Sequence, residues 1–247
     1  MDYQEINRAA MNGRVKSGWI WARPYSHEMV EAILEGKEGL HLTPNRIVPD
    51  SWFKGIKGLD FLGLASGGGQ QMPILSKLGA NVTSFDISDE MLSLDKMVAD
   101  REGVVLKTVQ GDMTEGLPFP DGFFDLVFMP VCLCYVREMD SIFKEIYRVL
   151  RTGGVLLTGQ DNGMNYLVDD CDMFTGSFPY DPLSSPELME ECMKSGSGIQ
   201  FSHTGGEILK SILSSGFTVT DVYEDTNPDG MLKERNIPSF IAMRAVK

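Results

Sequence analysis

Three groups of residues in this sequence have the chemistry and the spacing to bind a polar ligand. Three consecutive glycines, Gly67 to Gly69, follow the apolar run 59–64, Asp86 ends a second apolar run, and Asp112 follows a third. Glycines let a chain turn tightly and approach a ligand closely. Carboxylates accept hydrogen bonds from the two hydroxyls of a ribose or from the amino group of a base. Each aspartate alone is typical of a helix cap or a turn, but the three groups together predict a site for an adenosine-containing ligand.

Such a site requires strands that end at one edge of a sheet, and the sequence predicts them. Apolar runs alternate five times with helical periodicities, which indicates βαβ units, right-handed crossovers and a parallel sheet. In open sheets of this kind, ligands bind at the carboxyl ends of the strands. The expected strands cover residues 59–64, 82–85, 104–109, 124–129 and 155–158.

Several helices have clear starts in the sequence. Ser88 is placed to cap a helix that runs to Asp100, and Thr204 with Glu207 forms a capping box for a helix that ends at Gly216. Further helices are expected at 26–34 with Ser26 as its cap, 72–78, 139–150 and 186–194.

The chain ends with two more predicted strands, at 217–223 and 240–246. The loop between them is too short for a full βαβ crossover. We therefore expect an antiparallel hairpin at the edge of the sheet.

Two segments lie outside this alternation. Residues 1–58 contain no clear strand but several aromatic residues, among them Trp19, Trp21 and Tyr25. They either close the edge of the core or form a lid over the glycine turn. Residues 160–202 form a loop-rich insertion between the fifth strand and the following helix, and insertions of this length are usually functional. We expect one domain over residues 1–247, in which both segments are mobile without ligand and close over it.

The composition disfavours several classes of function. The chain has 247 residues with 35 acidic and 22 basic side chains, a net charge of −13 that disfavours a duplex nucleic-acid partner. It has no export signal and no apolar run of about 18 residues, so we expect a cytoplasmic protein without a membrane span. The cysteines form no C-x-x-C pair and have no histidine at metal-ligand spacing, which favours reduced thiols and no metal site. They are Cys132, Cys134, Cys171 and Cys192.

The chain resembles the class I S-adenosylmethionine-dependent methyltransferases over roughly residues 55–160. The segment L-G-L-A-S-G-G-G stands at the family's glycine-rich motif, Asp86 at its ribose acid, and Gly111-Asp112-Met113 at its adenine motif. The segments F-D-L-V-F-M-P-V and R-V-L-R-T-G-G-V-L match the surroundings of its fourth and fifth strands. The layout looks closest to the ubiquinone/menaquinone-type branch.

This resemblance implies a Rossmann-like α/β fold with a seven-stranded, mostly parallel sheet and an antiparallel terminal hairpin. It implies S-adenosyl-L-methionine as the cofactor and S-adenosyl-L-homocysteine as the product. The cofactor-binding residues that it implies are Ala65, Ser66, Gly67, Gly69, Gln70, Asp86, Ile87, Met91, Gly111, Asp112, Met113, Pro130, Val131 and Tyr135.

Two positions depart from the family pattern. The family usually has an acid in the first strand, two residues before the first glycine of the motif. Here these positions are Gly63 and Ala65, and Asp60 lies three residues too early. Groups from the N-terminal segment or Asp161 could hold the methionine amino group instead. The N/D-P-P-Y/F motif of nucleic-acid amino-methyltransferases is absent, since valine follows Pro130, and together with the acidic charge this favours a small-molecule acceptor.

The predicted function is transfer of a methyl group to an unidentified small molecule by in-line displacement. A sulfonium methyl is already activated, so alignment of the acceptor can supply most of the rate without a catalytic triad. His27, His203 and Tyr135 are candidate bases for an acceptor that arrives protonated. Cys132 and Cys134 are expected to be small core residues rather than nucleophiles.

Two alternatives stay open on the sequence. The first is a protein that binds the cofactor without catalysis, which Gly63 and Ala65 leave open. The second is an NAD-dependent Rossmann enzyme, since an acid after the second strand also suits NAD. Against the second, Met72 stands where the third glycine of G-x-G-x-x-G belongs. The sequence predicts neither the acceptor nor the oligomeric state.

Overall fold

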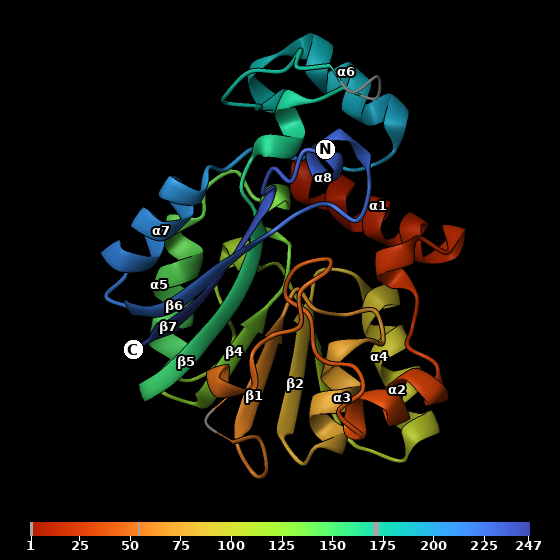
Figure 1. The fold of residues 1–247 in the computed structure, drawn as a ribbon, viewed down its shortest axis with the longest axis vertical. Helices are drawn as coiled ribbons and strands as arrows, with labels where there is room; N and C mark the ends of the chain where they lie inside the picture. Colours follow the sequence, from red (N-terminus) through yellow and green to blue (C-terminus); the bar gives the residue numbers. More distant parts are fainter. Residues whose placement is uncertain (1, 54, 170–172) are drawn as a thin grey trace.

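The computed structural model describes residues 2–53, 55–169 and 173–247. Its centre is a seven-stranded sheet of order β3-β2-β1-β4-β5-β7-β6 (Figure 1). Neighbouring strands from β3 to β5 are parallel, whereas β7 is antiparallel to both β5 and β6. The predicted α/β fold with an antiparallel terminal hairpin is therefore confirmed. The strands are β1 (Asp60–Leu64), β2 (Asn81–Asp86), β3 (Lys107–Gln110), β4 (Phe124–Met129), β5 (Leu150–Asp161), β6 (Thr218–Asp225) and β7 (Phe240–Val246).

Helices cover both faces of the sheet and one end of it. In Figure 1, α2, α3 and α4 lie on one side of the sheet and α5 and α7 on the other, while α1 and the insertion with α6 lie beyond its upper end. Within the described ranges, no helix is long and apolar enough to cross a membrane. The helices are α1 (Tyr3–Ser17), α2 (His27–Leu34), α3 (Gln71–Lys77), α4 (Asp89–Glu102), α5 (Asp140–Val149), α6 (Pro186–Ser195), α7 (Gly205–Ser214) and α8 (Gly230–Glu234).

The two faces of the sheet are buried in separate apolar clusters. The central strands β1 and β4 are almost fully buried, as expected for near-continuous apolar runs in a parallel sheet. One face packs on α5 and α7 through side chains such as Phe143 and Ile212. The other face packs on α2, α3 and the segment that contains Leu42 and Trp52. Part of the N-terminal region, around residues 30–52, thus completes the core.

The predicted helix caps are confirmed. The hydroxyl oxygens of Ser26 and Ser88 accept from the N–H groups three residues later, at 3.2 and 3.0 Å. Thr204 and Glu207 form both bonds of the capping box that begins α7. Each cap satisfies backbone N–H groups that the first turn of a helix leaves free.

The sequence does not predict α1. Among its 15 residues only Asn7 and Met11 are buried, so no apolar stripe marks it as a helix. Contacts with distant parts of the chain hold the helix in place. The buried Asn7 makes several of them, with the backbone of Tyr135 and Ile199.

β3 and β5 begin three or more residues away from their predicted starts, whereas the bounds of the other strands agree within two residues. β3 begins at Lys107 instead of 104, because Gly103 ends α4 in the left-handed conformation and the next N–H still bonds to that helix. β5 begins at Leu150 instead of 155. It thus includes residue 150, predicted as the end of the preceding helix, and residues 151–154, predicted as the stretch that stops that helix. They form an irregularity in the ladder, since β4 residues 124 and 126 pair with β5 residues 150 and 155.

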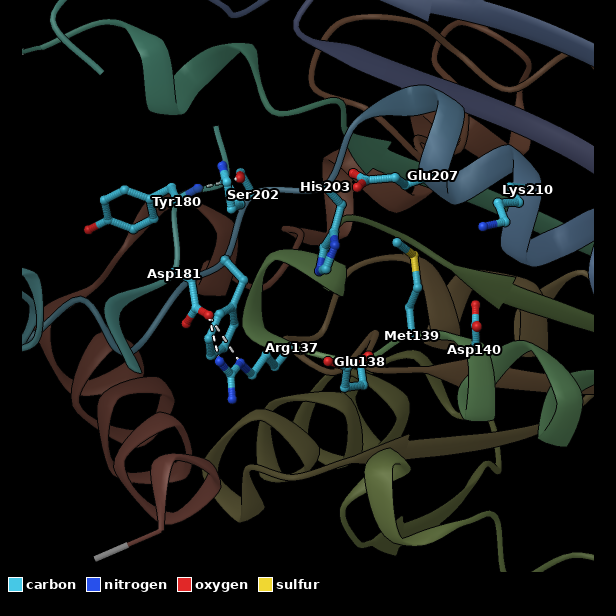
Figure 2. A pocket seen from close by; sticks show the side chains of 12 residues that line it. Arg137, Glu138, Met139, Asp140, Tyr180, Asp181, Ser202, His203, Glu207 and Lys210 are labelled. Carbon is cyan, nitrogen blue, oxygen red and sulfur yellow. Dashed lines mark hydrogen bonds and ion pairs between the residues drawn. The ribbon is translucent and has the colours of Figure 1, made fainter. Parts of the chain in front are cut away.

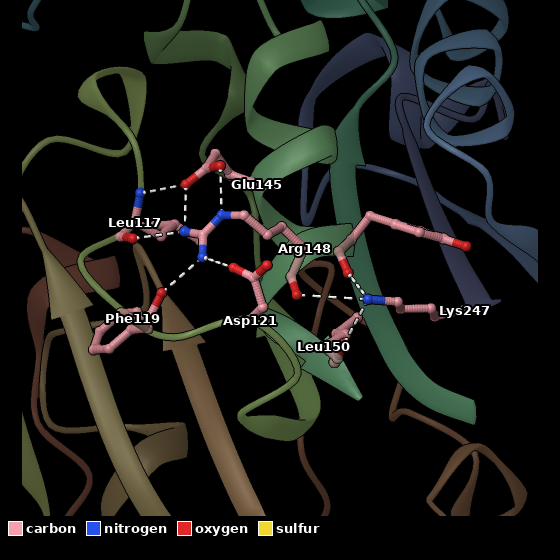
Figure 3. Close-up of polar contacts among 8 residues, drawn as sticks. Leu117, Phe119, Asp121, Glu145, Arg148, Leu150 and Lys247 are labelled. Carbon is pink, nitrogen blue, oxygen red and sulfur yellow. Dashed lines mark hydrogen bonds and ion pairs between the residues drawn. The ribbon is translucent and has the colours of Figure 1, made fainter. Parts of the chain in front are cut away.

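A polar cluster fixes the turn that leads into β4. The guanidinium of Arg148 donates to the carbonyl oxygens of Leu117 and Phe119, both at 2.8 Å, and pairs with Glu145 and Asp121, both at 2.7 Å (Figure 3). All of its donors are thus used by local acceptors. The cluster therefore supports the fold near the amino end of β4.

Candidate functional site

The glycine turn joins β1 to α3 and is held from two sides. The N–H of Gly67 donates to the carboxylate of Asp86 at 3.1 Å, and the N–H of Gly68 donates to the carbonyl oxygen of Met91 at 3.1 Å. Ala65, at the position of the family's first glycine, has a φ of 49°, a left-handed conformation that glycine adopts without steric cost. The turn is therefore tied to β2 and α4.

Asp86 ends β2 beneath this turn, as the sequence predicts. Its side chain is buried, and its two oxygens accept from the N–H groups of Gly67 and Ser88 at 3.1 and 2.9 Å. Burial raises the pKa of Asp86 to about 6, although the backbone hydrogen bonds oppose this change. Ionised at neutral pH, each oxygen keeps a lone pair with which to accept from a ribose hydroxyl.

A second buried carboxylate, Asp95 of α4, supports the turn and is not predicted from the sequence. Its oxygens accept from the N–H of Gly69 at 2.7 Å and from the hydroxyl of Ser84 at 2.6 Å. Burial raises the pKa of Asp95 to about 7. One feature of the sequence could have predicted this role: Asp95 is an acid four residues after Met91, on the apolar side of the predicted helix.

Asp112 follows β3 and begins a short 3-10 helix, Met113–Glu115. Its Oδ1 accepts from the N–H and the hydroxyl of Thr114 at 2.8 and 2.7 Å, so it caps a turn. The N–H of Gly111 donates to the carbonyl oxygen of Asp86 at 3.1 Å, which holds the ends of β3 and β2 together. The acids predicted for the ribose and for the base therefore follow neighbouring strands.

The segment after β4 forms the other wall of the site. The buried Gln160 of β5 accepts from the N–H groups of Cys132 and Leu133 at 3.0 and 2.9 Å and donates to the carbonyl oxygen of Pro130 at 3.1 Å. The sequence gives no sign of this role, because it depends on a partner strand. The 3-10 helix η4 (Leu133–Tyr135) follows, and the Tyr135 hydroxyl accepts a hydrogen bond from Arg14 of α1.

The residues predicted to bind the cofactor lie at the end of β2, in the segments that follow β1, β2, β3 and β4, or in the first turn of α4. Two of them, Gln70 and Met91, contact the N-terminal segment. The amide of Gln70 donates to the carbonyl oxygen of Arg23 at 3.0 Å, and Met91 packs with Met11 and Ala22 of the N-terminal segment. These two residues therefore contact the segment that covers the turn.

The missing acid of β1 has a steric explanation. A Cβ added at Gly63 would lie 2.1 Å from the sulfur of Met72 and 2.3 Å from the hydroxyl oxygen of Ser66. The space of an acidic side chain is thus already filled. Asp161, the other candidate for the methionine amino group, ends β5, two strands away from β1 and hence roughly 10 Å across the sheet. Its carboxylate is used by Gly163 and by Asn165.

The two histidines among the candidate bases have partners outside the glycine turn. His27 lies on α2, with its Nδ1 3.0 Å from the carboxylate of Glu102. His27, Glu31 and Glu102 could together offer three metal ligands, but Glu102 already pairs with Lys77 and Arg101. The buried His203 places its Nε2 2.6 Å from the carbonyl oxygen of residue 136.

The thiols near the site are protonated at neutral pH. Burial raises the pKa of Cys134 to about 12 and the pKa of Cys132 well above its usual value. A protonated thiol is a weak nucleophile, which agrees with the expected core role. Cys171 lies outside the described residues.

A pocket of about 340 Å³ lies between the start of α5, α7 and the insertion. Figure 2 shows the imidazole of His203 in its middle, with the ion pair between Arg137 and Asp181 on one side. Its lining contains none of the predicted cofactor residues. It is therefore separate from the glycine turn.

Comparison with known proteins places the chain in a family. Residues 62–158 match a methyltransferase domain family. The chain is 34% identical over 249 residues to the uncharacterized methyltransferase YbaJ of Bacillus subtilis, covering 98% of this chain and 97% of that protein. The chain belongs to the class I S-adenosylmethionine-dependent methyltransferases. This methyltransferase is also 31% identical over 189 residues, 72% of each protein, to the ubiquinone/menaquinone biosynthesis C-methyltransferase UbiE of Psychromonas ingrahamii.

A solved structure supports the same fold. The S-adenosylmethionine-dependent methyltransferase from Mesorhizobium loti superposes with a TM-score of 0.64 over 80% of this chain and 94% of that one, at 19% identity. The predicted enzyme class and cofactor are confirmed by these relationships, and neither the NAD-dependent enzyme nor the non-catalytic binder is favoured.

Proposed function

We propose that this methyltransferase acts on a small molecule, with S-adenosylmethionine on the glycine turn, its ribose on Asp86 and its base beside Asp112. The observation that carries this proposal is the buried carboxylate of Asp86, which ends β2 directly under the turn. An acid in this position fits two ribose hydroxyls, and Asp112 at the end of the neighbouring strand fits the amino group of the base.

The residues around the proposed site favour positioning over proton transfer. The cofactor supplies a methyl group already activated on a sulfonium. Burial raises the pKa of Tyr135, as it does for Cys132 and Cys134, so these groups keep their protons at neutral pH. They can donate hydrogen bonds but do not remove a proton from an acceptor. The site therefore suits an acceptor that needs no strong base.

The N-terminal segment supports a closed site. The N–H of Tyr25 donates to the carbonyl oxygen of Gly69 at 2.9 Å, and a Cβ added at Gly68 would lie 3.4 Å from the carbonyl oxygen of Trp21. A ligand on the turn would thus be covered by residues 19–25. We include this segment and the insertion 160–202 in the proposal, as parts that close over the cofactor and the acceptor and exclude water.

Calorimetry with S-adenosylhomocysteine tests the cofactor site. We expect micromolar affinity, roughly −8 kcal/mol. Asp86→Ala should weaken binding by about 1–3 kcal/mol, because the ribose hydroxyls lose their buried acceptor. Asp89→Ala is the matched control, since Asp89 is an exposed acid three residues further on. Equal affinity of the wild type and Asp86→Ala would remove Asp86 from the site.

The acceptor is tested separately. Release of S-adenosylhomocysteine is followed with a library of small metabolites and, in parallel, with RNA, DNA and protein. A small molecule that stimulates release above the background without acceptor supports the proposal. Stimulation by a macromolecule alone would contradict it.

A further inference from the structure

Arg14 of α1 carries a half-buried cation beside Tyr135 of η4, the 3-10 helix that follows β4. Its guanidinium donates to the hydroxyl of Tyr135 and lies 4.2 Å from the ring centre of Trp19. Among the described residues no carboxylate pairs with it, whereas Arg8 on the same helix has two acidic partners. A guanidinium has five N–H donors, so most of its donors remain open to a ligand.

The position of α1 sets Arg14 over the proposed cofactor site. Asn12 of α1 accepts from the hydroxyl of Ser88 at 2.6 Å, directly after the strand that ends in Asp86. Met11, three residues before Arg14, packs with Met91 beside the glycine turn. The helix therefore crosses from the end of β2 to Tyr135 after β4.

The sheet order fixes which part of the cofactor reaches Arg14. With the base beside Asp112 after β3 and the ribose on Asp86 after β2, the methionine part continues over β1 and β4. The end of this part carries one ammonium and one carboxylate. Arg14 and Tyr135 lie on that side of the site.

In the part of the chain that the structure describes, the usual acid of β1 is missing as a partner for the ammonium. Gly63 replaces the usual acid, and the space beside it holds the hydroxyl of Ser66, which is buried and has no hydrogen-bond partner among the described residues. That hydroxyl is a neutral acceptor. With this acid missing, we look for a charged contact at the carboxylate of the methionine end.

We propose that Arg14 and Tyr135 bind the carboxylate of the methionine part, so that this enzyme selects its cofactor through the carboxylate more than through the ammonium. The planar guanidinium matches a carboxylate with two parallel N–H donors, and the Tyr135 hydroxyl can donate to it while accepting from Arg14. Trp19 holds the guanidinium plane from one face. The proposal rests on the cofactor position proposed above.

Ligand analogues test the proposal on the unmodified enzyme. Calorimetry compares S-adenosylhomocysteine with its decarboxylated analogue, its deaminated analogue and 5′-methylthioadenosine, which lacks the whole amino-acid end. We expect loss of the carboxylate to weaken binding about 10- to 100-fold, and loss of the amine by less than about threefold. A larger loss of affinity for the deaminated analogue than for the decarboxylated analogue would overturn the proposal. Failure of all four ligands to bind would overturn the proposed cofactor site as well.

Variants then assign the effect to Arg14. Arg14→Met should weaken S-adenosylhomocysteine about 30-fold and leave 5′-methylthioadenosine within twofold, because only the first ligand has a carboxylate. The affinity of Arg14→Lys for S-adenosylhomocysteine should lie between those of the wild type and Arg14→Met, since lysine keeps the charge but lacks the planar pair of donors. Arg8→Met is the matched control on the same helix and should bind all four ligands normally. An equal loss for ligands with and without the carboxylate in Arg14→Met would show that Arg14 acts through the fold, and would overturn the proposal.

Discussion

The two halves of the site are assembled over very different distances along the chain. The turn half consists of the glycine turn, Asp86 and Asp95, and its side-chain bonds to the turn join residues 19 and 26 positions apart. The cover half consists of α1, η4 and residues 199–203, and its bonds join residues 121 to 192 positions apart. Contacts of short separation close small loops and cost less chain entropy. The turn half is thus a local unit, whereas the cover half depends on the complete fold.

The two halves also differ in the charged groups that they bury. The turn half holds two buried carboxylates, and burial raises the pKa of Asp86 to about 6 and of Asp95 to about 7. The cover half is centred on Asn7, whose amide joins Tyr135 and Ile199 without any charge. We infer that the burial of charge in the turn half lowers stability in exchange for a preorganised ligand site. The cover half is held by the neutral amide of Asn7 and by the half-buried Arg14, through bonds that can open.

The largest expected effect concerns Asp95. Its folded-state pKa is raised, so the folded state binds the proton more tightly, and stability falls as pH rises from about 4 to about 7. In Asp95→Asn the amide oxygen can still accept from the N–H of Gly69, the amide NH2 can donate to the hydroxyl oxygen of Ser84, and the charge is removed. We expect this variant to be more stable than the wild type by up to about 4 kcal/mol at pH 8, and equally stable below about pH 4. Urea unfolding at both pH values measures the difference.

Asp89→Asn is the control for Asp95→Asn, because it removes an exposed acid from the same helix. It should not show this gain at pH 8. A wild type that is as stable at pH 8 as Asp95→Asn would show that the turn half does not carry a buried charge, and the contrast between the halves would fail.

The next effect separates the halves within α1. The buried Asn7 bonds to the backbone of Tyr135 and Ile199 in the cover half, whereas Asn12 bonds to Ser88 and Asp89 nearer the turn half. We expect Asn7→Ala to lower the free energy of unfolding by about 2–3 kcal/mol, because buried backbone groups lose their partners, and Asn12→Ala by about 1 kcal/mol or less. Chemical denaturation of both variants tests this. A larger loss of unfolding free energy in Asn12→Ala than in Asn7→Ala would contradict this prediction.

The difference between the halves also explains what the sequence could predict. The bounds of β4 and β7, the caps Ser26 and Ser88, and the acids after β2 and β3 follow from local patterns, and the structure agrees with them. These features depend on neighbours within one turn or one strand. Local rules are sufficient for them.

The features that the sequence misses all depend on distant partners. Arg14 and Asn7 lie on a helix without an apolar stripe, and their partners follow β4 or belong to the insertion. Gln160 organises a loop about 30 residues away. Asp95 belongs to the turn half and lies on the apolar side of its helix, but its partner Gly69 is 26 residues away and in another element. In each case the residue type is visible in the sequence but the partner is not.

A smaller effect is expected in the pH dependence of binding. If the ionised carboxylate of Asp86 accepts from the ribose, affinity must fall as pH drops through about 6, where Asp86 gains its proton. The dissociation constant of S-adenosylhomocysteine should rise about tenfold between pH 7 and pH 5. 5′-Methylthioadenosine keeps the ribose and should show the same change, which assigns it to the turn half. A flat profile for both ligands would contradict the role of Asp86.

The smallest effect concerns motion of the cover half. The buried amide of Asn7 joins α1 to residue 199 at the end of the insertion, so opening of one segment breaks bonds to the other. We therefore expect the two segments to open as one unit when the ligand is absent. Hydrogen exchange should show protection rising by about tenfold in residues 3–17 and in 186–203 together on adding S-adenosylhomocysteine, while β1 and β4 change little. Asn7→Ala should uncouple the two responses. Full protection of both segments in the free enzyme would mean that the cover half is a permanent part of the core, and ligands would have to enter elsewhere along the strand ends.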